Sequence, residues 1–89
     1  MSPFSSHKRI MHHEFRRALS HLREKGFVDS QVDQVASLFR GDMDEHGLNQ
    51  GISEDELSKA IHWLKEHPFN HHLSPHNIET VEKVLRHYL

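Results

Sequence analysis

Hydrophobic residues recur every three or four positions in four stretches of the chain, the spacing of one face of an α-helix. The first stretch runs from about Ser6 to Lys25. Its apolar positions are Met11, Phe15, Ala18, Leu19 and Leu22. Gly26 follows and predicts the helix end, because glycine is common just past a helix C-terminus.

A second helix is predicted after Asp29 or Ser30, since either side chain can cap a helix N-terminus. Gly41 is expected to end it. Its inward-facing residues are Val32, Val35, Ala36 and Phe39.

A third helix is predicted from the sequence SEDEL, in which Ser53 and Glu56 have the spacing of a capping box, with Pro68 ending the helix. Its apolar stripe is Leu57, Ala60, Ile61 and Leu64. The fourth helix is predicted to begin with Ser74 as its cap and Pro75 at the first helical position. Its buried face is Ile78, Val81, Val84, Leu85 and Tyr88. No stretch has the period-two alternation of a strand.

The predicted fold is therefore all-α: four short helices packed as two helical hairpins in one domain, residues 1–89. Each helix is too short to be stable alone, so the four must share one core. Residues 1–5 are expected to be disordered. The absence of cysteine, of a signal-type segment and of a membrane-length apolar run favours a cytoplasmic protein with no membrane partner.

The sequences of the second and fourth helices resemble one another, which gives a weak internal echo. FVDSQVDQVASLF and LSPHNIETVEKVL align at an offset of 46 residues, which matches Val32 to Ile78 and Phe39 to Leu85. Both follow an amphipathic helix. Two interpretations are equally open: a duplicated helical hairpin, or the likeness of any two capped amphipathic helices.

Charge is unevenly distributed along the chain. Residues 7–25 carry a net charge of +4, residues 29–56 carry −7, and residues 57–89 carry +1. The chain is also histidine-rich, and protonation of all 11 histidines changes its net charge from −2 to +9. Because the ordinary pKa of histidine is about 6.5, the surface potential must depend on mildly acidic pH. Whether these histidines act as a pH sensor is left open.

The acidic middle of the chain, FRGDMDEHGLNQGISEDEL, resembles an EF-hand calcium loop over residues 38–57. Asp42, Asp44 and Gly47 match its first half, Ile52 its apolar position where paired loops meet, and Glu56 its closing acid. The resemblance implies helix–loop–helix geometry between the second and third helices. It also implies a metal site of Asp42, Asp44, Asn49 and Glu56, with calcium as the cofactor.

The same stretch departs from the EF-hand pattern in length. Asp42 to Glu56 spans 15 residues, three more than the usual loop of about 12. Glu56 is also explained as part of the capping box. No family resemblance extends over the whole chain, and the prediction with fewest assumptions is a structured acidic connection that needs no cofactor.

Four histidines cluster between the third and fourth helices: His67, His71, His72 and His76. Pairs four residues apart converge on a helix, as in zinc sites. Here Pro68 and Pro75 predict a loop, so only adventitious zinc or nickel binding is expected.

Basic residues on the first helix form a cationic ridge: Arg9, Arg16, Arg17 and Arg23. Such a ridge can contact an acidic protein or the phosphates of a nucleic acid. Trp63, if exposed beside Leu64, is a candidate anchor for a protein partner. No nucleophile elbow, phosphate-binding glycine loop or HExxH motif is present, so an enzyme is not expected.

The sequence thus predicts a small non-enzymatic, regulatory module that binds another protein through the basic helix and Trp63. The alternatives are a metal-responsive module and a nucleic-acid-binding protein. The sequence leaves the oligomeric state open.

Overall fold

The computed structural model describes residues 9–44 and 51–89. Its elements, in chain order, are β1 (Arg9–Ile10), α1 (His12–Glu24), α2 (Asp29–Leu38), α3 (Arg40–Asp44), β2 (Ile52–Ser53), α4 (Glu54–Glu66), the 3-10 turn η3 (Pro68–Asn70) and α5 (Pro75–Arg86). The predicted all-α class is confirmed, with one two-stranded ladder added.

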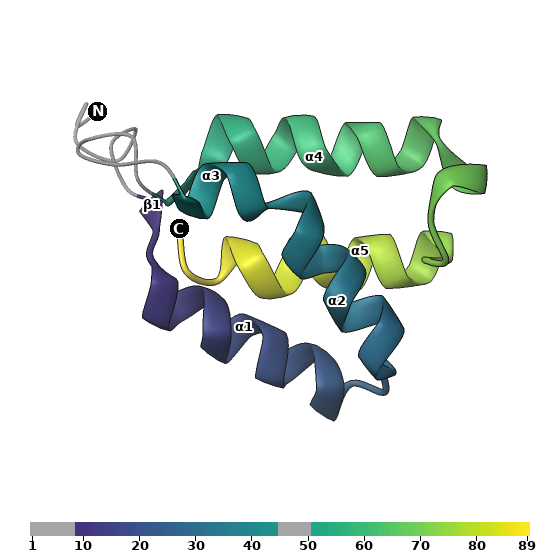
Figure 1. Ribbon diagram of the computed structural model, residues 1–89, viewed down its shortest axis with the longest axis horizontal. Helices are drawn as coiled ribbons and strands as arrows, with labels where there is room; N and C mark the ends of the chain where they lie inside the picture. The colour runs from purple at the N-terminus through teal and green to yellow at the C-terminus, as the bar shows by residue number, and fades with distance from the viewer. Residues whose placement is uncertain (1–8, 45–50) are drawn as a thin grey trace.

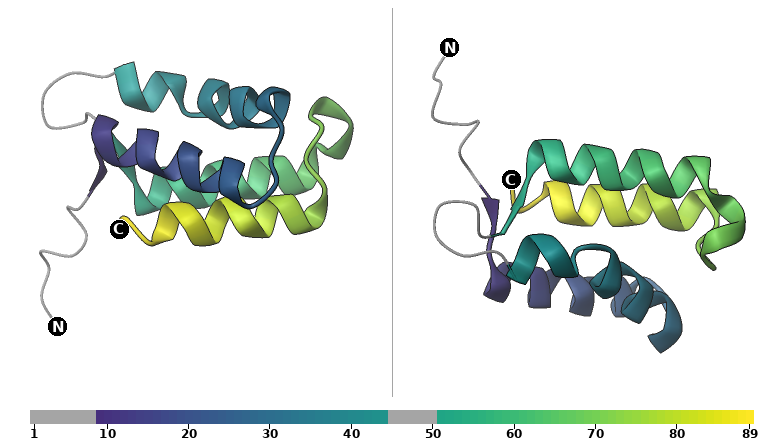
Figure 2. Two further views of the ribbon diagram at one scale, coloured as in Figure 1. Left: turned by 90° about the horizontal axis from the view of Figure 1, so that it is seen from below. Right: turned by 45° about the horizontal axis from the view of Figure 1, so that its top comes forward.

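The helices form two antiparallel hairpins, α1 with α2 and α4 with α5 (Figures 1 and 2). The hairpins are joined most closely by α1 and α5, which pack against one another. No helix in the described ranges is long and apolar enough to cross a bilayer.

One hydrophobic core lies between the hairpins and receives side chains from all five α-helices and both strands. The predicted inward positions Phe15, Ala18 and Leu22 are buried, as are Val35 and Phe39. Met11 is an exception. It precedes α1 and is 36% exposed, because the helix begins later than its apolar spacing predicts.

The predicted starts of the last two long helices are confirmed. The Ser53 hydroxyl accepts the Glu56 N–H at 3.1 Å, and the Glu56 carboxylate accepts the Ser53 N–H at 2.8 Å. Ser74 caps α5 in the same way, with Pro75 in the first turn. α2 is different, because Val28 is its cap residue and the Gln31 side chain accepts the Val28 N–H at 3.0 Å.

Four predictions about the first half are wrong. The cap residue of α2 is Val28, not Asp29 or Ser30. The first helix begins at His12, not Ser6, and Arg9 lies on a strand. A two-residue strand is too short to show alternation, so its pattern was absent from the sequence. Gly41 does not end α2: that helix stops at Leu38, and Gly41 lies inside α3. Residues 1–5, predicted to be disordered, lie outside the described residues.

The two strands bring distant parts of the chain together. Arg9 pairs with Ser53 and Ile10 with Ile52 in an antiparallel ladder. Gly51, just before β2, has φ +97°, and a Cβ there would lie 2.6 Å from the Ile10 carbonyl oxygen. Only glycine therefore allows this close approach.

The internal echo corresponds to a repeated order of elements: strand, helix, helix in residues 9–38, and again in residues 52–86. Equivalent residues also make equivalent contacts. Glu14 and Glu56 each accept the backbone N–H three residues earlier, and so do Gln31 and Asn77. The likeness therefore extends from sequence spacing to the hydrogen bonds that start all four long helices.

Candidate interaction groove

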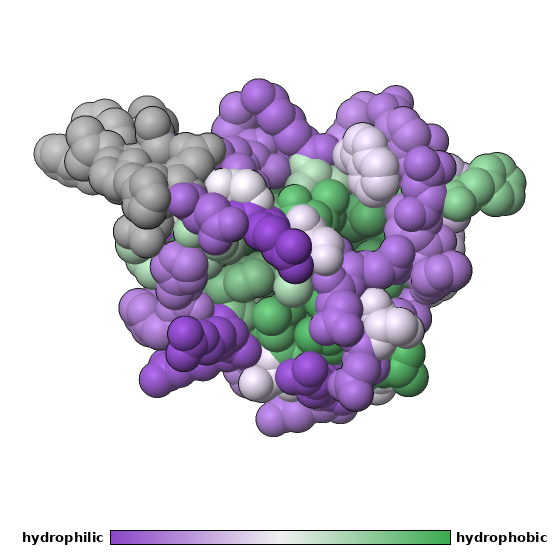
Figure 3. Space-filling view, viewed as in Figure 1, coloured by the Kyte–Doolittle hydropathy of each residue, from purple (hydrophilic) through white to green (hydrophobic). Residues whose placement is uncertain are grey.

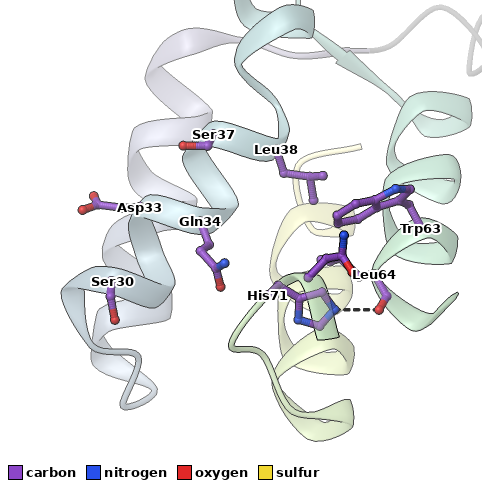
Figure 4. A pocket seen from close by; sticks show the side chains of 9 residues that line it. Ser30, Asp33, Gln34, Ser37, Leu38, Trp63, Leu64 and His71 are labelled. Carbon is purple, nitrogen blue, oxygen red and sulfur yellow. Dashed lines mark hydrogen bonds between the residues drawn. The ribbon is translucent and has the colours of Figure 1, made fainter. Parts of the chain in front are cut away.

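A shallow groove of about 520 Å³ lies between α2 and α4 (Figure 4). We call it the α2/α4 groove. It is lined by Ser30, Asp33, Gln34, Ser37 and Leu38 from α2, and by Trp63, Leu64, Asn70 and His71 from α4 and the following turn. Figure 3 shows hydrophobic side chains in a hollow across this face, surrounded by hydrophilic ones.

Trp63 forms one wall of the groove. Its indole is 38% exposed and stacks on the His67 ring, with the ring centroids 4.7 Å apart and an interplanar angle of 20°. The His67 Nδ1–H donates to the Trp63 carbonyl at 2.9 Å, which holds the stack in place. The indole is thus fixed on one side while the other borders the groove, so a partner could bind it with little loss of side-chain entropy.

α2 forms the opposite wall and is tied to the turn after α4. The Gln34 side-chain oxygen accepts the His72 backbone N–H at 2.8 Å. Gln31 donates to the His72 carbonyl at 3.4 Å and to the Asn77 side chain at 3.3 Å. These bonds cross between sequence-distant elements and fix the width of the groove at this end.

The charge of the groove is negative. Asp33 is the one ionised side chain among its described lining residues, and no lysine or arginine borders it there. Asp29 lies on the same helix and is paired with Arg23 at 3.4 Å. Apolar walls beside one carboxylate favour an apolar group with a cation next to it.

His71 closes the groove at the turn end. It is 9% exposed and lies with its ring centroid 6.3 Å from that of Trp63. Both ring nitrogens are hydrogen-bonded: Nε2 to the Leu64 carbonyl at 2.7 Å and Nδ1 to the Leu73 N–H at 3.1 Å. A buried imidazole with both nitrogens satisfied is part of the packing of this turn.

The predicted basic ridge lies elsewhere. Arg16 and Arg17 are exposed on α1, which contributes no described residue to the groove. Arg9 is not on that helix but on β1. The structure therefore separates the arginines from Trp63 into two surfaces, and contact of α1 with a protein or a nucleic acid stays a prediction.

The acidic connection brings two of the predicted metal ligands together. Glu56, at the start of α4, is in hydrogen-bonding contact with the Asp42 side chain on α3. The Asp42 carbonyl accepts the Gly51 N–H at 3.1 Å. Asp44 is exposed at the end of α3, and Asn49 lies outside the described residues. Ile52, which the EF-hand resemblance places where paired loops meet, lies on β2 and pairs with Ile10 on β1.

A basic side chain from the other half of the molecule binds Glu56. The Arg9 Nη1 lies 3.0 Å from the Glu56 carboxylate and 3.5 Å from the Gly51 carbonyl. Burial raises the pKa of Glu56. The hydrogen bonds of its carboxylate with the Ser53 backbone and with the Asp42 and Ser53 side chains, together with the charge of Arg9, outweigh burial and hold that pKa below its ordinary 4.5. The positive charge beside Glu56, the last acid of the EF-hand-like stretch, is thus supplied by Arg9.

Metal binding by these residues stays a prediction. In residues 9–44 and 51–89, no three histidine, aspartate or glutamate side chains are grouped so as to hold a metal ion. The four clustered histidines have separate places: His67 stacks on Trp63, His71 is buried, and the side chains of His72 and His76 are exposed.

No protein-family description, no curated protein and no solved structure matches this chain. The function must therefore be inferred from the geometry.

The sequence points to Trp63 with Leu64 beside it, but it gives no sign of the α2 wall of the groove. Leu38 and Gln34 are not marked by any sequence pattern, because periodicity does not show which other element will lie opposite a given face of a helix. His71 was noticed only as one histidine among four. The spacing of Pro68 and Pro75 marked the turn as long, and a long turn was the available clue to a site.

Proposed function

We propose that the protein is a non-enzymatic interaction module whose α2/α4 groove binds an amphipathic helix of another protein. An apolar side chain of that helix packs between Trp63 and Leu38, and a lysine or arginine one turn away pairs with Asp33. The binding is non-covalent and needs no cofactor.

The observation that carries this proposal is the half-exposed, immobilised indole of Trp63 at the edge of an apolar hollow. Tryptophan is prominent among the residues that dominate binding energies at protein interfaces. An apolar groove between two helices is also the common receptor for the apolar face of a third helix.

The charge of the groove selects the partner. Asp33 is exposed on α2 at the rim of the groove, where its carboxylate points outward and away from Trp63 on the α4 wall (Figure 4). A partner helix can pack its apolar anchor against Trp63 and place a neighbouring basic residue beside Asp33. An acidic helix meets like charge at Asp33, which disfavours it.

The test is selection from a displayed library of helical peptides that combines apolar anchors with lysine, arginine, aspartate or glutamate at flanking positions. The recovered peptides are expected to be basic. Trp63 is the only tryptophan in the chain, so its emission reports occupancy of the groove directly. Truncation of an anchor residue costs at least about 2 kcal/mol of binding free energy. Trp63→Ala should therefore lower the affinity for a labelled peptide by tenfold or more.

Matched variants locate the contact. Asp33→Asn is expected to weaken the binding of basic peptides. Asp55→Asn, on the first turn of α4 away from the groove, should leave their affinity unchanged. Charge reversal at Arg16 and Arg17 should also leave it unchanged. If this reversal abolishes binding and Trp63→Ala does not, the partner binds α1 and the groove proposal is wrong.

A further inference from the structure

His71 differs from the other described histidines in being buried. It is the only buried polar side chain in the described ranges, and it separates two cavities. On one side lies the α2/α4 groove. On the other lies an apolar cavity of about 290 Å³ between α4 and the start of α5, lined in part by Leu73 and Ile78.

The hydrogen bonds of His71 assign its protonation state. The Leu64 carbonyl at 2.7 Å can only accept, so Nε2 carries a proton and donates. The Leu73 backbone N–H at 3.1 Å can only donate, so Nδ1 accepts and carries none. The folded structure thus holds His71 as the neutral Nε2–H tautomer.

A second proton is incompatible with this arrangement. It must bind to Nδ1, where it faces the Leu73 N–H at a distance that suits only a donor and an acceptor. The ring or the backbone must then move, and a buried N–H loses its acceptor. Histidine is the side chain whose ordinary titration range makes such an event accessible in mildly acidic solution.

The surroundings determine what moves. Leu73 is buried, and its neighbour His72 holds the turn to α2 through the Gln34 bond. A shift of the Leu73 backbone therefore reaches both the core and the groove wall.

Three charged residues on three helices, together with His67 just after α4, lie around the two cavities that His71 lines. Asp33 on α2 lines one, Lys65 on α4 and Glu79 on α5 line the other, and His67 stacks on Trp63. Among the described residues, none makes an ion pair with His71 that could hold its protonated ring in place.

We propose that His71 is a pH-dependent latch of the groove. The neutral ring holds the Leu73 backbone and keeps the groove in its binding form. The protonated ring releases Leu73 and lowers the affinity for the partner helix. The regulatory role rests on the proposed function of the groove, whereas the release of Leu73 does not depend on any partner.

The release of Leu73 is tested without ligand, by amide hydrogen exchange at pH 7.5 and pH 5.5. Protection of the Leu73 N–H is expected to fall about tenfold, relative to the amide of Val81 in the core, as the loss of one buried hydrogen bond implies. Nitrogen chemical shifts of the His71 ring at pH 7.5 should show an unprotonated Nδ1. A protonated Nδ1 at that pH, or unchanged Leu73 protection, overturns the proposal.

The effect on binding is tested with a basic peptide selected at pH 7.5. The wild-type affinity should fall by about tenfold at pH 5.5, the equivalent of that one bond. His71→Gln keeps an N–H for the Leu64 carbonyl, and its amide does not titrate. The affinity of this variant for the peptide should therefore change much less between pH 7.5 and pH 5.5. His76→Gln, which removes an exposed imidazole that lines neither cavity, should keep the wild-type pH dependence.

These outcomes separate the two proposals. If no peptide binds at pH 7.5 but Leu73 loses protection at pH 5.5, the groove function fails and the latch itself stands. If peptide binds equally at both pH values, the groove stands and the regulatory role is wrong. If His71→Gln follows the wild-type pH dependence, another histidine is responsible and the latch is wrong.

Discussion

The two helical hairpins are built alike but turn differently. Ile10 and Ile52 correspond at an offset of 42 residues, whereas Val32 and Ile78 correspond at 46, so the second turn holds four more residues than the first. The first turn passes tightly through Gly26 at φ +99°. The second contains η3, the buried His71 and the fully exposed Phe69.

This difference places the α2/α4 groove at the longer of the two turns. Both turns reverse the chain, and the shorter one places Phe27 in the core and leaves Val28 exposed. The four extra residues allow the second turn to reach α2, place His71 behind Trp63 and end the groove. The groove is thus bounded by the turn at which the two hairpins differ most.

The largest effect is expected in the core, at the equivalent residues Leu22 and Leu64. Both are buried, but Leu64 also lines the groove and the neighbouring cavity. Replacement of a buried leucine by alanine costs about 2–5 kcal/mol. We expect Leu22→Ala to fall in the upper part of that range and Leu64→Ala in the lower, since its surroundings can collapse.

The measurement is urea unfolding of both variants. Equal losses of unfolding free energy, or a larger loss for Leu64→Ala, would contradict the view that the second hairpin is packed more loosely at its turn.

A smaller effect is expected in the turns themselves. Gly26→Ala places a side chain in a left-handed conformation and should cost about 1–2 kcal/mol, although a Cβ there meets no other atom. Phe69→Ala, in the longer turn, removes a ring that is 99% exposed and should change stability by less than about 0.5 kcal/mol. Thermal unfolding distinguishes the two. A large loss for Phe69→Ala would show that the long turn has a structural task.

A pH-dependent effect is expected at the equivalent capping acids Glu14 and Glu56. The pKa of Glu56 is lower in the folded protein than its ordinary 4.5, so its contribution to stability is present above that pH. The contribution is lost as pH falls through the folded value. Because Glu56 is only partly buried, we expect less than about 1 kcal/mol.

Unfolding free energies measured between pH 6 and pH 3 test this directly. Glu56→Gln should flatten the fall of stability at acidic pH. Glu14→Gln, which alters the same capping position on the exposed surface, is the matched control. Identical pH profiles for the two variants would show that Arg9 and Asp42 add nothing at Glu56.

The fold was more predictable than the site, and particular residues show why. Ser53, Ser74 and Pro75 start helices through contacts with their immediate neighbours, so their effect can be read locally. β1 forms because Ile10 meets Ile52, a contact across 42 residues that leaves no periodic signal. The groove depends likewise on Gln34 reaching the backbone of His72. Short sequence windows do not reveal such contacts.

The packing of α1 against α5 has a consequence for the order of synthesis. α1 leaves the ribosome first, but one of its main partners in the core is the last helix described. β1 must likewise wait for β2. α1 therefore keeps part of its apolar face unpaired until α5 has been synthesised. The two hairpins should therefore complete their shared core together, after α5 has been made, and not one after the other.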